Sequence, residues 1–224
     1  MAESTIESAS ETVEADRIRE EILTAAMHLF AHYGFAKTTM ADIARETGMS
    51  PGNLYRYYRN KQAIGRSVVG QYFRMAEARM ARAVEVPDRS PAACIRAMIQ
   101  DGVGHLIGEM RENPRIVELA IFICSDPEGV VELNHHITWK ERALAQEIAR
   151  GMEIGDFAPG DPDALGRAMI AATRAFWMPM ALAHMAEPAK TPMAIDQVLD
   201  LLLAGMEKGA PVAPVPSAPS AQDH

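Results

Sequence analysis

The sequence is poor in cysteine and contains no long apolar run. Its 224 residues include only two cysteines, Cys94 and Cys124, and neither lies in a CxxC pattern or a Cys/His cluster. We therefore predict no disulfide framework and no cysteine-based metal site, and we interpret both residues as small buried hydrophobes, with a redox switch as the alternative. No segment approaches the roughly 18 apolar residues of a membrane-spanning helix, and the acidic N-terminus is unlike a signal peptide. The chain is thus predicted to be cytoplasmic and not associated with a membrane.

Motifs typical of enzymes are missing as well. The sequence contains no GxSxG elbow, no phosphate-binding loop, no GxGxxG fingerprint and no HExxH zinc motif. The adjacent His135 and His136 do not form a metal pair, because neighbouring residues on a helix point about 100° apart. We therefore expect no catalytic residue, no metal and no cofactor, and an enzyme built in the helical body is the least favoured class.

Aromatic side chains make up only 6% of the chain, although hydrophobic residues reach 48%. Aliphatic side chains and the 15 methionines must therefore fill most of the core. Methionine adapts its shape easily, so such an interior suits a pocket for varied apolar ligands. A loosely specified helical core is the alternative interpretation.

Charge is distributed unevenly along the chain. The formal net charge is −8, which disfavours contact with phosphate groups. However, residues 1–16 carry five acidic side chains and no basic one, whereas residues 17–82 carry eleven Lys and Arg against five Asp and Glu. The remainder of the chain is acidic again. Positive charge is therefore concentrated in one early segment, where contact with nucleic acid would be possible.

This positive segment contains two short predicted helices joined by a tight turn, within residues 38–61. Thr39 can cap the first helix, and Asp42 is placed to reach back to the free N–H groups. Gly48 ends that helix, because glycine adopts a left-handed backbone without steric cost. Ser50 then caps the second helix. The pattern is typical of a helix-turn-helix unit.

The second of these helices separates apolar from polar side chains. Leu54 and Tyr58 lie four residues apart and can face inward. A recognition helix places its N-terminal residues against base edges in the major groove, where asparagine can pair with adenine and arginine with guanine. Tyrosine and lysine side chains can reach phosphates. The predicted DNA-binding residues are Thr39, Ser50, Gly52, Asn53, Tyr55, Arg56, Tyr57 and Lys61. An ordinary surface turn between two helices is the alternative.

Residues 17–61 resemble the DNA-binding domain of the TetR family of one-component transcriptional regulators. The matching segments are YGF at 33–35, TTMADIA at 38–44, GMSPGNLYRYY at 48–58 and NK at 60–61. Tyr58 stands where the family more often has phenylalanine. The resemblance implies an all-α fold, with a three-helix DNA-binding domain followed by a regulatory body of about six helices.

We divide the chain into four parts on this basis. Residues 1–16 and 209–224 are expected to be disordered tails, the first acidic and the second rich in proline and alanine, because neither has much to bury. Residues 17–63 are expected to form the helix-turn-helix domain, and residues 64–208 the helical ligand-binding and dimerisation domain. Its predicted helices cover about 62–86, 90–113, 114–124, 126–152, 163–184 (kinked at Pro179) and 193–208.

A ligand site is expected in the helical body. The resemblance implies a small-molecule effector among the helices of residues 90–184, and the methionines and aromatic side chains there favour a mainly apolar one. Arg174 or His105 could meet a polar or anionic end, although a lone helical histidine is more often structural. The candidate ligand-binding residues are Met98, His105, Phe122, Trp139, Arg174 and Trp177.

A homodimer is expected from the last two long predicted helices. Each carries apolar side chains on two sides, which predicts two neighbours for each helix. Paired with the same helices of a second copy, they would form a four-helix bundle. The candidate interface residues are Trp177, Ala181, Ile195, Val198, Leu199 and Leu202. The alternative is that both are simply central core helices.

The favoured hypothesis, which depends on the resemblance, is a ligand-responsive transcriptional regulator that binds double-stranded operator DNA. In this hypothesis a homodimeric repressor binds a pseudo-palindromic operator and is released by an apolar small molecule. The alternative is a DNA-bound helical interaction protein that acts through a protein partner instead of a small-molecule effector.

Overall fold

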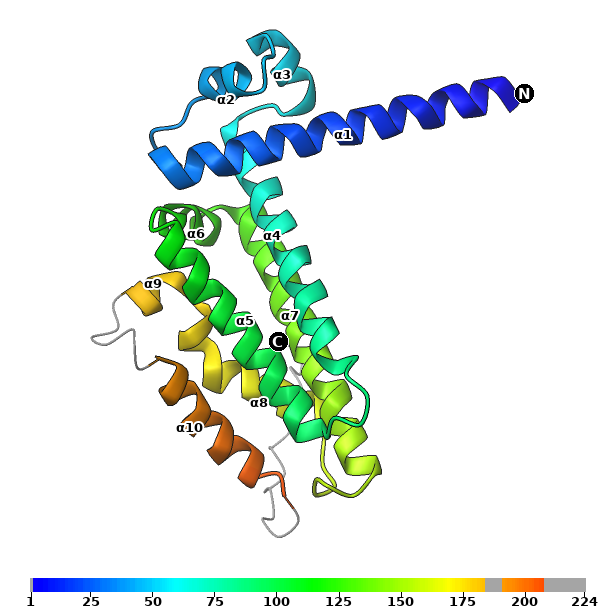
Figure 1. The fold of residues 1–224 in the computed structure, drawn as a ribbon, viewed down its shortest axis with the longest axis vertical. Helices are drawn as coiled ribbons and strands as arrows, with labels where there is room; N and C mark the ends of the chain where they lie inside the picture. Colours follow the sequence, from blue (N-terminus) through cyan, green and yellow to red (C-terminus); the bar gives the residue numbers. More distant parts are fainter. Residues whose placement is uncertain (1, 184–190, 208–224) are drawn as a thin grey trace, which may run out of the picture.

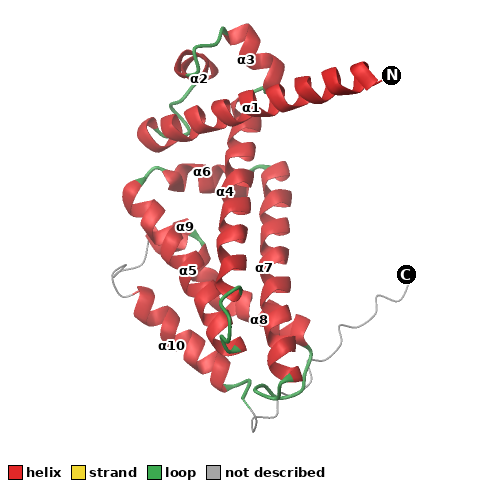
Figure 2. Ribbon diagram, turned by 45° about the vertical axis from the view of Figure 1, so that its right-hand side comes forward, coloured by secondary structure: helices red, strands yellow, loops and turns green. Residues whose placement is uncertain are grey.

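The computed structural model describes residues 2–183 and 191–207, and the regular elements in these ranges are all helices (Figure 2). The predicted all-α fold is therefore confirmed. In chain order the elements are α1 (Ala2–Tyr33), α2 (Met40–Glu46), α3 (Pro51–Tyr57), α4 (Lys61–Val84), α5 (Pro91–Glu112), α6 (Ile116–Ser125), α7 (Pro127–Glu153), α8 (Pro162–Thr173), the 3-10 helix η1 (Arg174–Trp177), α9 (Pro179–Ala183) and α10 (Thr191–Ala204). Within the described ranges, no helix is long and apolar enough to cross a membrane.

The helices form a small N-terminal domain on a larger helical body (Figure 1). Helices α1, α2 and α3 lie at one end, and α4 runs from them into the body, where it packs beside α5 and α7. The core of the N-terminal domain is shared with the body, because α6 contributes Leu119 and Ile123 to it. A second core lies between α4, α5, α7, α8 and α10 and includes Met80, Ile95, Leu144, Met169 and Leu199.

Side-chain caps explain where the helices of the body begin. Ser90, Asp126 and Asp161 each accept a hydrogen bond from the backbone N–H three residues later. Each is followed by a proline at the first helical position, where a missing N–H costs nothing. A cap of this kind stabilises a helix by about 1 kcal/mol. The first residues of α5, α7 and α8 were therefore predictable to within one or two residues.

The structure differs from the prediction that residues 1–16 are disordered, because α1 is continuous from Ala2. Alanine and glutamate are strong helix formers, and this outweighs the lack of apolar residues. Arg17 pairs with Glu14 and with Glu21, at the spacings that place side chains next to each other on a helix. The N-terminal part of α1 projects beyond the rest of the molecule (Figure 1). The other predicted tail, residues 209–224, lies outside the described residues.

The helix predicted over residues 163–184 is broken into three elements. Helix α8 ends at Thr173, η1 follows, and Met178 is extended before α9 starts. Pro179 explains the break, because proline disfavours helical geometry at the preceding residue and cannot donate a backbone hydrogen bond. The break directs Trp177 towards α5, where a Cβ at Gly102 would lie 2.6 Å from its ring. Glycine at that position therefore makes room for the tryptophan.

Candidate DNA-binding helix and ligand cavity

The helix-turn-helix is built as its local sequence predicts. Thr39 and Asp42 form a capping box: the Thr39 hydroxyl accepts from the Asp42 N–H at 3.2 Å, and the Asp42 carboxylate accepts from the Thr39 N–H at 3.0 Å. Gly48 adopts a φ of +67°, in the left-handed region that favours glycine. The Ser50 hydroxyl accepts from the Asn53 N–H at 3.3 Å and so starts α3. These short-range interactions fix the angle at which α3 is presented.

Helix α3 presents a polar face to solvent. Leu54 is completely buried and anchors the helix, whereas Gly52, Tyr55 and Arg56 are exposed. Within the part of the chain that the structure describes, the Arg56 guanidinium and the Asn53 side-chain amide have no hydrogen-bond or ion-pair partner. Their donors and acceptors are therefore free to meet another molecule. Helix α3 lies at the outer edge of the N-terminal domain, away from the body (Figure 1).

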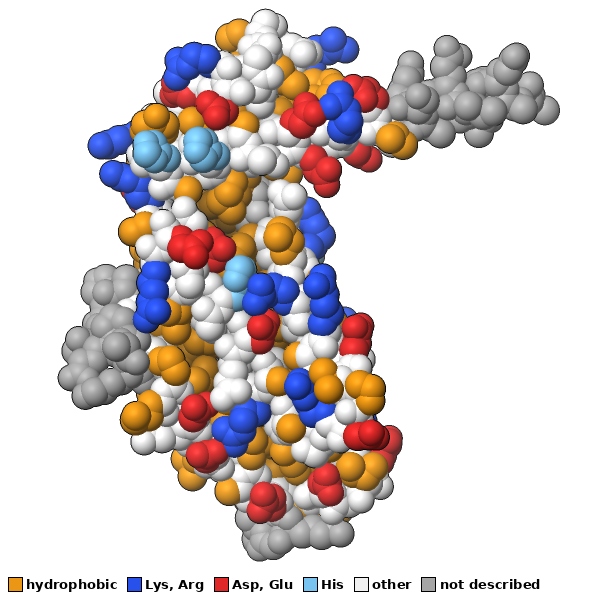
Figure 3. Space-filling model, viewed as in Figure 1, with side chains coloured by type: hydrophobic (Ala, Val, Ile, Leu, Met, Phe, Trp, Pro, Cys, Tyr) orange, Lys and Arg blue, Asp and Glu red, His pale blue; other side chains and the backbone are white. Residues whose placement is uncertain are grey.

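The surface carries charged side chains of both signs. In Figure 3, Lys and Arg side chains lie around the N-terminal domain together with Asp and Glu side chains, and both kinds also lie along the body. Two of the basic side chains near the helix-turn-helix, Lys37 and Arg45, are exposed. An exposed basic rim next to α3 favours contact with a phosphate backbone.

Lys61 was predicted to contact phosphate, but the structure places its ammonium against the protein itself. The ammonium donates to the carbonyl oxygen of Phe35 at 2.6 Å and to that of Ala36 at 3.2 Å. It also lies 4.6 Å from the centre of the Phe35 ring. Burial lowers the pKa of Lys61, and the charge of Glu118 opposes that shift. Lys61 therefore fastens the start of α4 to the turn after α1.

We expect Lys61→Ala to affect stability more than the electrostatics of DNA binding. Loss of two charge-assisted hydrogen bonds should cost about 1.5–3 kcal/mol, which lowers Tm by several degrees. The exposed Lys37→Ala is the matched control and should leave Tm unchanged. Thermal unfolding and the salt dependence of DNA affinity measure the two effects. An unchanged Tm, together with a salt dependence of DNA affinity whose slope is reduced by about one, would instead support the predicted contact of Lys61 with a phosphate.

The body contains a cavity of about 110 Å³ between α4, α5, α6, α7 and α9. Its wall is mainly apolar and includes Val69, Leu106, Leu119, Ile123 and Trp177. An engineered protein cavity of about 150 Å³ binds benzene, so the space suits a ligand portion about the size of one ring. The cavity lies next to the N-terminal domain, because α1 also reaches its wall.

Five of the six predicted ligand-binding residues do not line this cavity; Trp177 does. Met98 is fully buried in the second core, Trp139 is half-buried against that core, and Arg174 is exposed. His105 stacks on Tyr72 with ring centres 5.8 Å apart. Tyr72 lines the cavity, whereas His105 does not. Helical periodicity could not decide these positions, because a cavity depends on how several helices cross.

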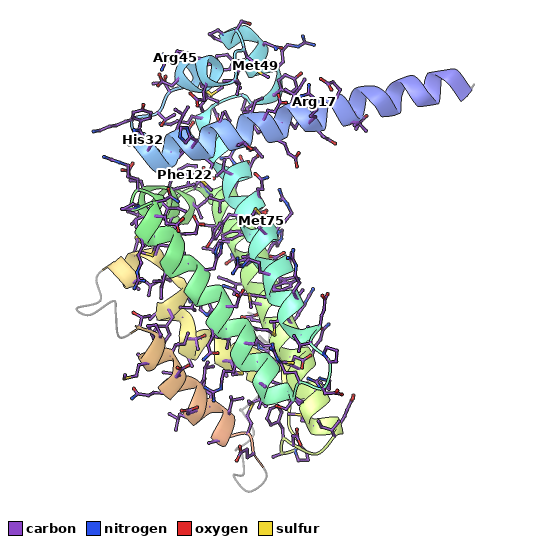
Figure 4. All side chains as sticks on the ribbon, viewed as in Figure 1. Arg17, His32, Arg45, Met49, Met75 and Phe122 are labelled. Carbon is purple, nitrogen blue, oxygen red and sulfur yellow. The ribbon has the colours of Figure 1, made fainter. Side chains whose placement is uncertain are left out.

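Phe122 is also outside the cavity, although it lies on the helix that forms part of the wall. Its ring stacks on Phe35 of the N-terminal domain, with ring centres 4.4 Å apart. Figure 4 shows Phe122 on α6, close beneath α1. The next turn carries Glu118, whose carboxylate accepts from the Ala36 N–H at 3.3 Å. Helix α6 therefore contacts the cavity with Leu119 and the DNA-binding domain with Phe122.

Ion pairs hold α7 to the start of α4, and a further one, between Arg59 and Glu128, joins the N-terminal domain to the body. Arg66 of α4 pairs with Asp126, the cap of α7, at 3.1 Å, and both side chains are largely buried. Arg66 also pairs with Glu128, as does Arg59 of the segment after α3. The largely buried pair is worth more than the exposed one, since water screens the latter. The start of α4 is thereby held to α7, a wall of the cavity.

Three polar side chains in the cavity wall were not predicted. His136 Nδ1 lies 2.8 Å from Glu77 Oε1, and its ring stacks on Phe73 with centres 4.3 Å apart. Burial lowers the pKa of His136 to about 3, so the neutral ring donates its Nδ1–H to the Glu77 carboxylate. The Lys140 ammonium lies 4.1 Å from the centre of the Trp177 ring. Tyr72 completes the polar set in the cavity.

The position of Lys140 in the sequence is itself a signal of burial. Within the predicted helix over 126–152, it lies on the same apolar stripe as Leu133, Ile137 and Leu144. Burying a charged side chain is unfavourable unless the charge is paired or solvated. A lysine in an apolar stripe therefore indicates a contact with water or a binding site. The structure places Lys140 inside the cavity, 4% exposed.

The predicted dimer-interface residues are mostly used within the chain. Ile195 and Leu199 of α10 are buried in the second core, and Trp177 packs against α5. The other three members of the set, Ala181, Val198 and Leu202, are half-buried. The outward side of α10 carries other apolar residues, Met193 at 63% and Leu201 at 75% exposed. Periodicity found two apolar sides on this helix but could not tell which one faces inward.

A helix-turn-helix with a free polar face, joined through one long helix to an all-α body with an internal cavity, is the architecture of a one-component transcriptional regulator. The family comparisons agree with that class. Residues 22–68 match bacterial regulatory proteins of the tetR family, and residues 91–209 match the tetracyclin repressor-like C-terminal domain. The chain therefore belongs to the TetR family of DNA-binding transcriptional regulators.

Individual relatives are distant in sequence and similar in fold. The HTH-type transcriptional regulator TtgR of Pseudomonas putida is 27% identical over 156 residues, which cover 67% of this chain and 73% of TtgR. A TetR transcription regulator from Haloarcula marismortui superposes with a TM-score of 0.69 at 18% identity, covering 86% of this chain and 100% of that one. FadR of Thermus thermophilus, a TetR-family transcriptional repressor solved in complex with lauroyl-CoA, superposes with a TM-score of 0.61 at 23% identity. The alignment covers 88% of this chain and 99% of FadR.

Proposed function

We propose that this protein is a homodimeric repressor that binds a pseudo-palindromic operator and leaves it when a mainly apolar small molecule enters the cavity. The observation that carries the proposal is the outward face of α3. Asn53 and Arg56 have the donors and acceptors that distinguish adenine and guanine in the major groove. Gly52 adds no side chain, so the backbone at the start of α3 can come close to the DNA.

The dimer is supported by apolar surface of the body that no described residue covers. Met193 and Leu201 project from α10, and the exposed positions of the neighbouring α8 are occupied mainly by alanine and arginine. Small side chains allow close approach of a second α8, and a two-fold axis would bury both patches at once. Such a dimer must place its two α3 helices about 34–36 Å apart to enter successive major grooves.

The cavity supports a mainly apolar effector. Most of its wall consists of aliphatic and aromatic side chains, which come mainly from five helices of the body. The fold relative FadR of Thermus thermophilus was solved with lauroyl-CoA, which contains a long apolar chain. By analogy of fold, we infer that the effector of this protein enters the same helical body.

The route from the cavity to the DNA-binding domain is short. A ligand that exceeds the cavity must push its walls apart, and α6 is the wall that also contacts the Phe35 ring through Phe122. Displacement of α6 would tilt the DNA-binding domain on α4 and change the spacing of the two α3 helices. The effector needs about 1–3 kcal/mol of preference for the displaced form to weaken DNA binding about 5- to 150-fold.

Selection of bound duplexes from a random pool tests the proposal. We expect the selected sequences to share two inverted half-sites about one helical turn apart, because the dimer has two-fold symmetry. Retained complexes should contain two copies of the chain, and a screen of apolar compounds should yield members that release the DNA. A pool without enrichment, or enriched half-sites that occur singly or in direct repeat, would contradict the proposed dimer on DNA.

A further inference from the structure

We propose that the effector carries an anionic oxygen group, a carboxylate or an ionised phenol, that pairs with Lys140 inside the cavity. This inference rests on the proposed function, since it takes the cavity as the effector site. It adds the chemical class of the ligand: an apolar ring or chain with one acidic group.

The Lys140 ammonium has few partners among the described residues. The side chain is 4% exposed and lines the cavity. Within the described ranges its Nζ makes no hydrogen bond and no ion pair, and its contact is the face of the Trp177 ring at 4.1 Å. An ammonium has three N–H donors, and burying them without acceptors is unfavourable. The N–H groups of the Lys140 ammonium are thus available to a hydrogen-bond acceptor in the cavity.

The neighbouring carboxylate, that of Glu77, is already hydrogen-bonded to His136. Glu77 of α4 faces the same region, but its Oε1 lies 2.8 Å from His136 Nδ1 and accepts that proton. Glu141, on the same helix as Lys140, attracts the ammonium without an ion-pair contact. The other titratable groups in the wall are Tyr72 of α4 and Cys124 of α6, and α5 and α9 add apolar surface. Among the described residues no hydrogen-bond acceptor contacts the Lys140 ammonium, and a ligand that enters the cavity can supply one.

The protonation states of Lys140 and His136 also favour an anionic ligand. Burial lowers the pKa of Lys140 to about 8, against the opposing attraction of Glu77 and Glu141. The ammonium is therefore mostly charged at neutral pH, although its charge is poorly compensated. His136 stays neutral, because burial lowers its pKa to about 3. A bound anion would thus pair with Lys140 and would raise the pKa of that ammonium.

A matched series of ring compounds tests this assignment. The probes are para-chlorobenzoate, para-chlorobenzamide and para-chlorobenzylamine, which share a ring suited to the cavity and differ in the charge of one group. Isothermal titration calorimetry on the full-length protein should show the benzoate binding at least about tenfold more tightly than the benzamide, as a charge-assisted hydrogen bond in a dry site predicts. The benzylamine should bind most weakly, because like charges repel.

Lys140→Met keeps the side-chain length and removes the charge. It should abolish the preference for the benzoate and leave benzamide affinity within about twofold, since the amide does not need the charge. Arg142→Met is the matched control, because it removes a positive charge from the exposed side of the same helix. That variant should keep the preference for the benzoate.

The pH dependence tests the assignment in two further ways, through benzoate affinity and through the stability of the ligand-free protein. Benzoate affinity in the unmodified protein should be constant below pH 8 and fall up to about tenfold per pH unit above it, as the free ammonium loses its proton. Without ligand, the protein should gain stability relative to Lys140→Met as pH rises from 8 towards 10.5. The reason is that the unfolded chain then retains a proton that the folded chain has released.

The possible outcomes distinguish a failure of the proposed Lys140 pairing from a failure of the cavity as the effector site. Equal binding of benzoate and benzamide, or a benzoate affinity that does not change above pH 8 or in Lys140→Met, would overturn the proposed pairing and leave the cavity as an effector site. If none of the three probes binds below about 10 mM, the assignment of the cavity as the effector site also fails.

Discussion

Replacing Arg56 by alanine should weaken binding to the selected operator by about 1–3 kcal/mol and remove the preference for one base pair in each half-site. The guanidinium is exposed on the outward face of α3 and has no partner among the described residues. It is therefore available to donate two parallel hydrogen bonds to a guanine. Fluorescence anisotropy with the operator and with single-base variants measures both affinity and preference.

The control for this prediction is Arg82→Ala, which removes an exposed positive charge near the far end of α4. That variant should bind the operator as the unmodified protein does. A different result for Arg56→Ala would be informative: uniform weakening across all sequences, with a salt slope reduced by about one, would mean that Arg56 contacts a phosphate. Unchanged affinity and preference would mean that α3 does not contact the DNA.

Replacing Phe122 by alanine should leave ligand and DNA binding largely intact and weaken the coupling between them. The ring does not line the cavity, but it forms the stacked contact of α6 with Phe35 of the N-terminal domain. Without it, displacement of α6 should still move the N-terminal domain but move it less, because Leu119, Ile123 and the Glu118 hydrogen bond to the Ala36 N–H still join α6 to that domain. The ligand-induced loss of operator affinity should therefore be several-fold smaller than in the unmodified protein. Operator titrations with and without saturating ligand give this ratio.

Two further variants guard against general destabilisation. Ile121→Ala shortens an exposed residue of the same helix and should keep the coupling. Phe122→Leu retains apolar volume while losing the ring stack, so it should reproduce the weakened coupling with a smaller loss of stability. If Phe122→Ala responds to ligand as the unmodified protein does, α6 does not transmit the signal through this contact.

Much of the fold could be predicted because its signals are local. The capping box of Thr39 and Asp42, the left-handed Gly48 and the cap at Ser50 each involve residues a few positions apart, so the sequence alone determines them. The same holds for the caps before α5, α7 and α8. The helix-turn-helix, its exposed polar face and the order of the helices were therefore accessible before the structure.

The parts that could not be predicted depend on contacts between distant elements. Lysine is a residue type that often contacts phosphate, but the Lys61 ammonium donates hydrogen bonds to backbone carbonyl groups 25 and 26 residues earlier in the chain. The inward side of α10 depends on where α5 and α8 lie, so the buried stripe of Ile195 and Leu199 was mistaken for an interface. The cavity and Lys140 depend on the crossing of five helices.

The most direct test of the central claim is the binding of the purified full-length protein to the selected duplex as ionic strength is raised, with the stoichiometry measured by native mass spectrometry. The account predicts two copies of the chain per duplex, with an affinity that falls steeply as salt displaces the phosphate contacts. No binding to the duplex even at low ionic strength, or binding that does not depend on salt, would contradict it.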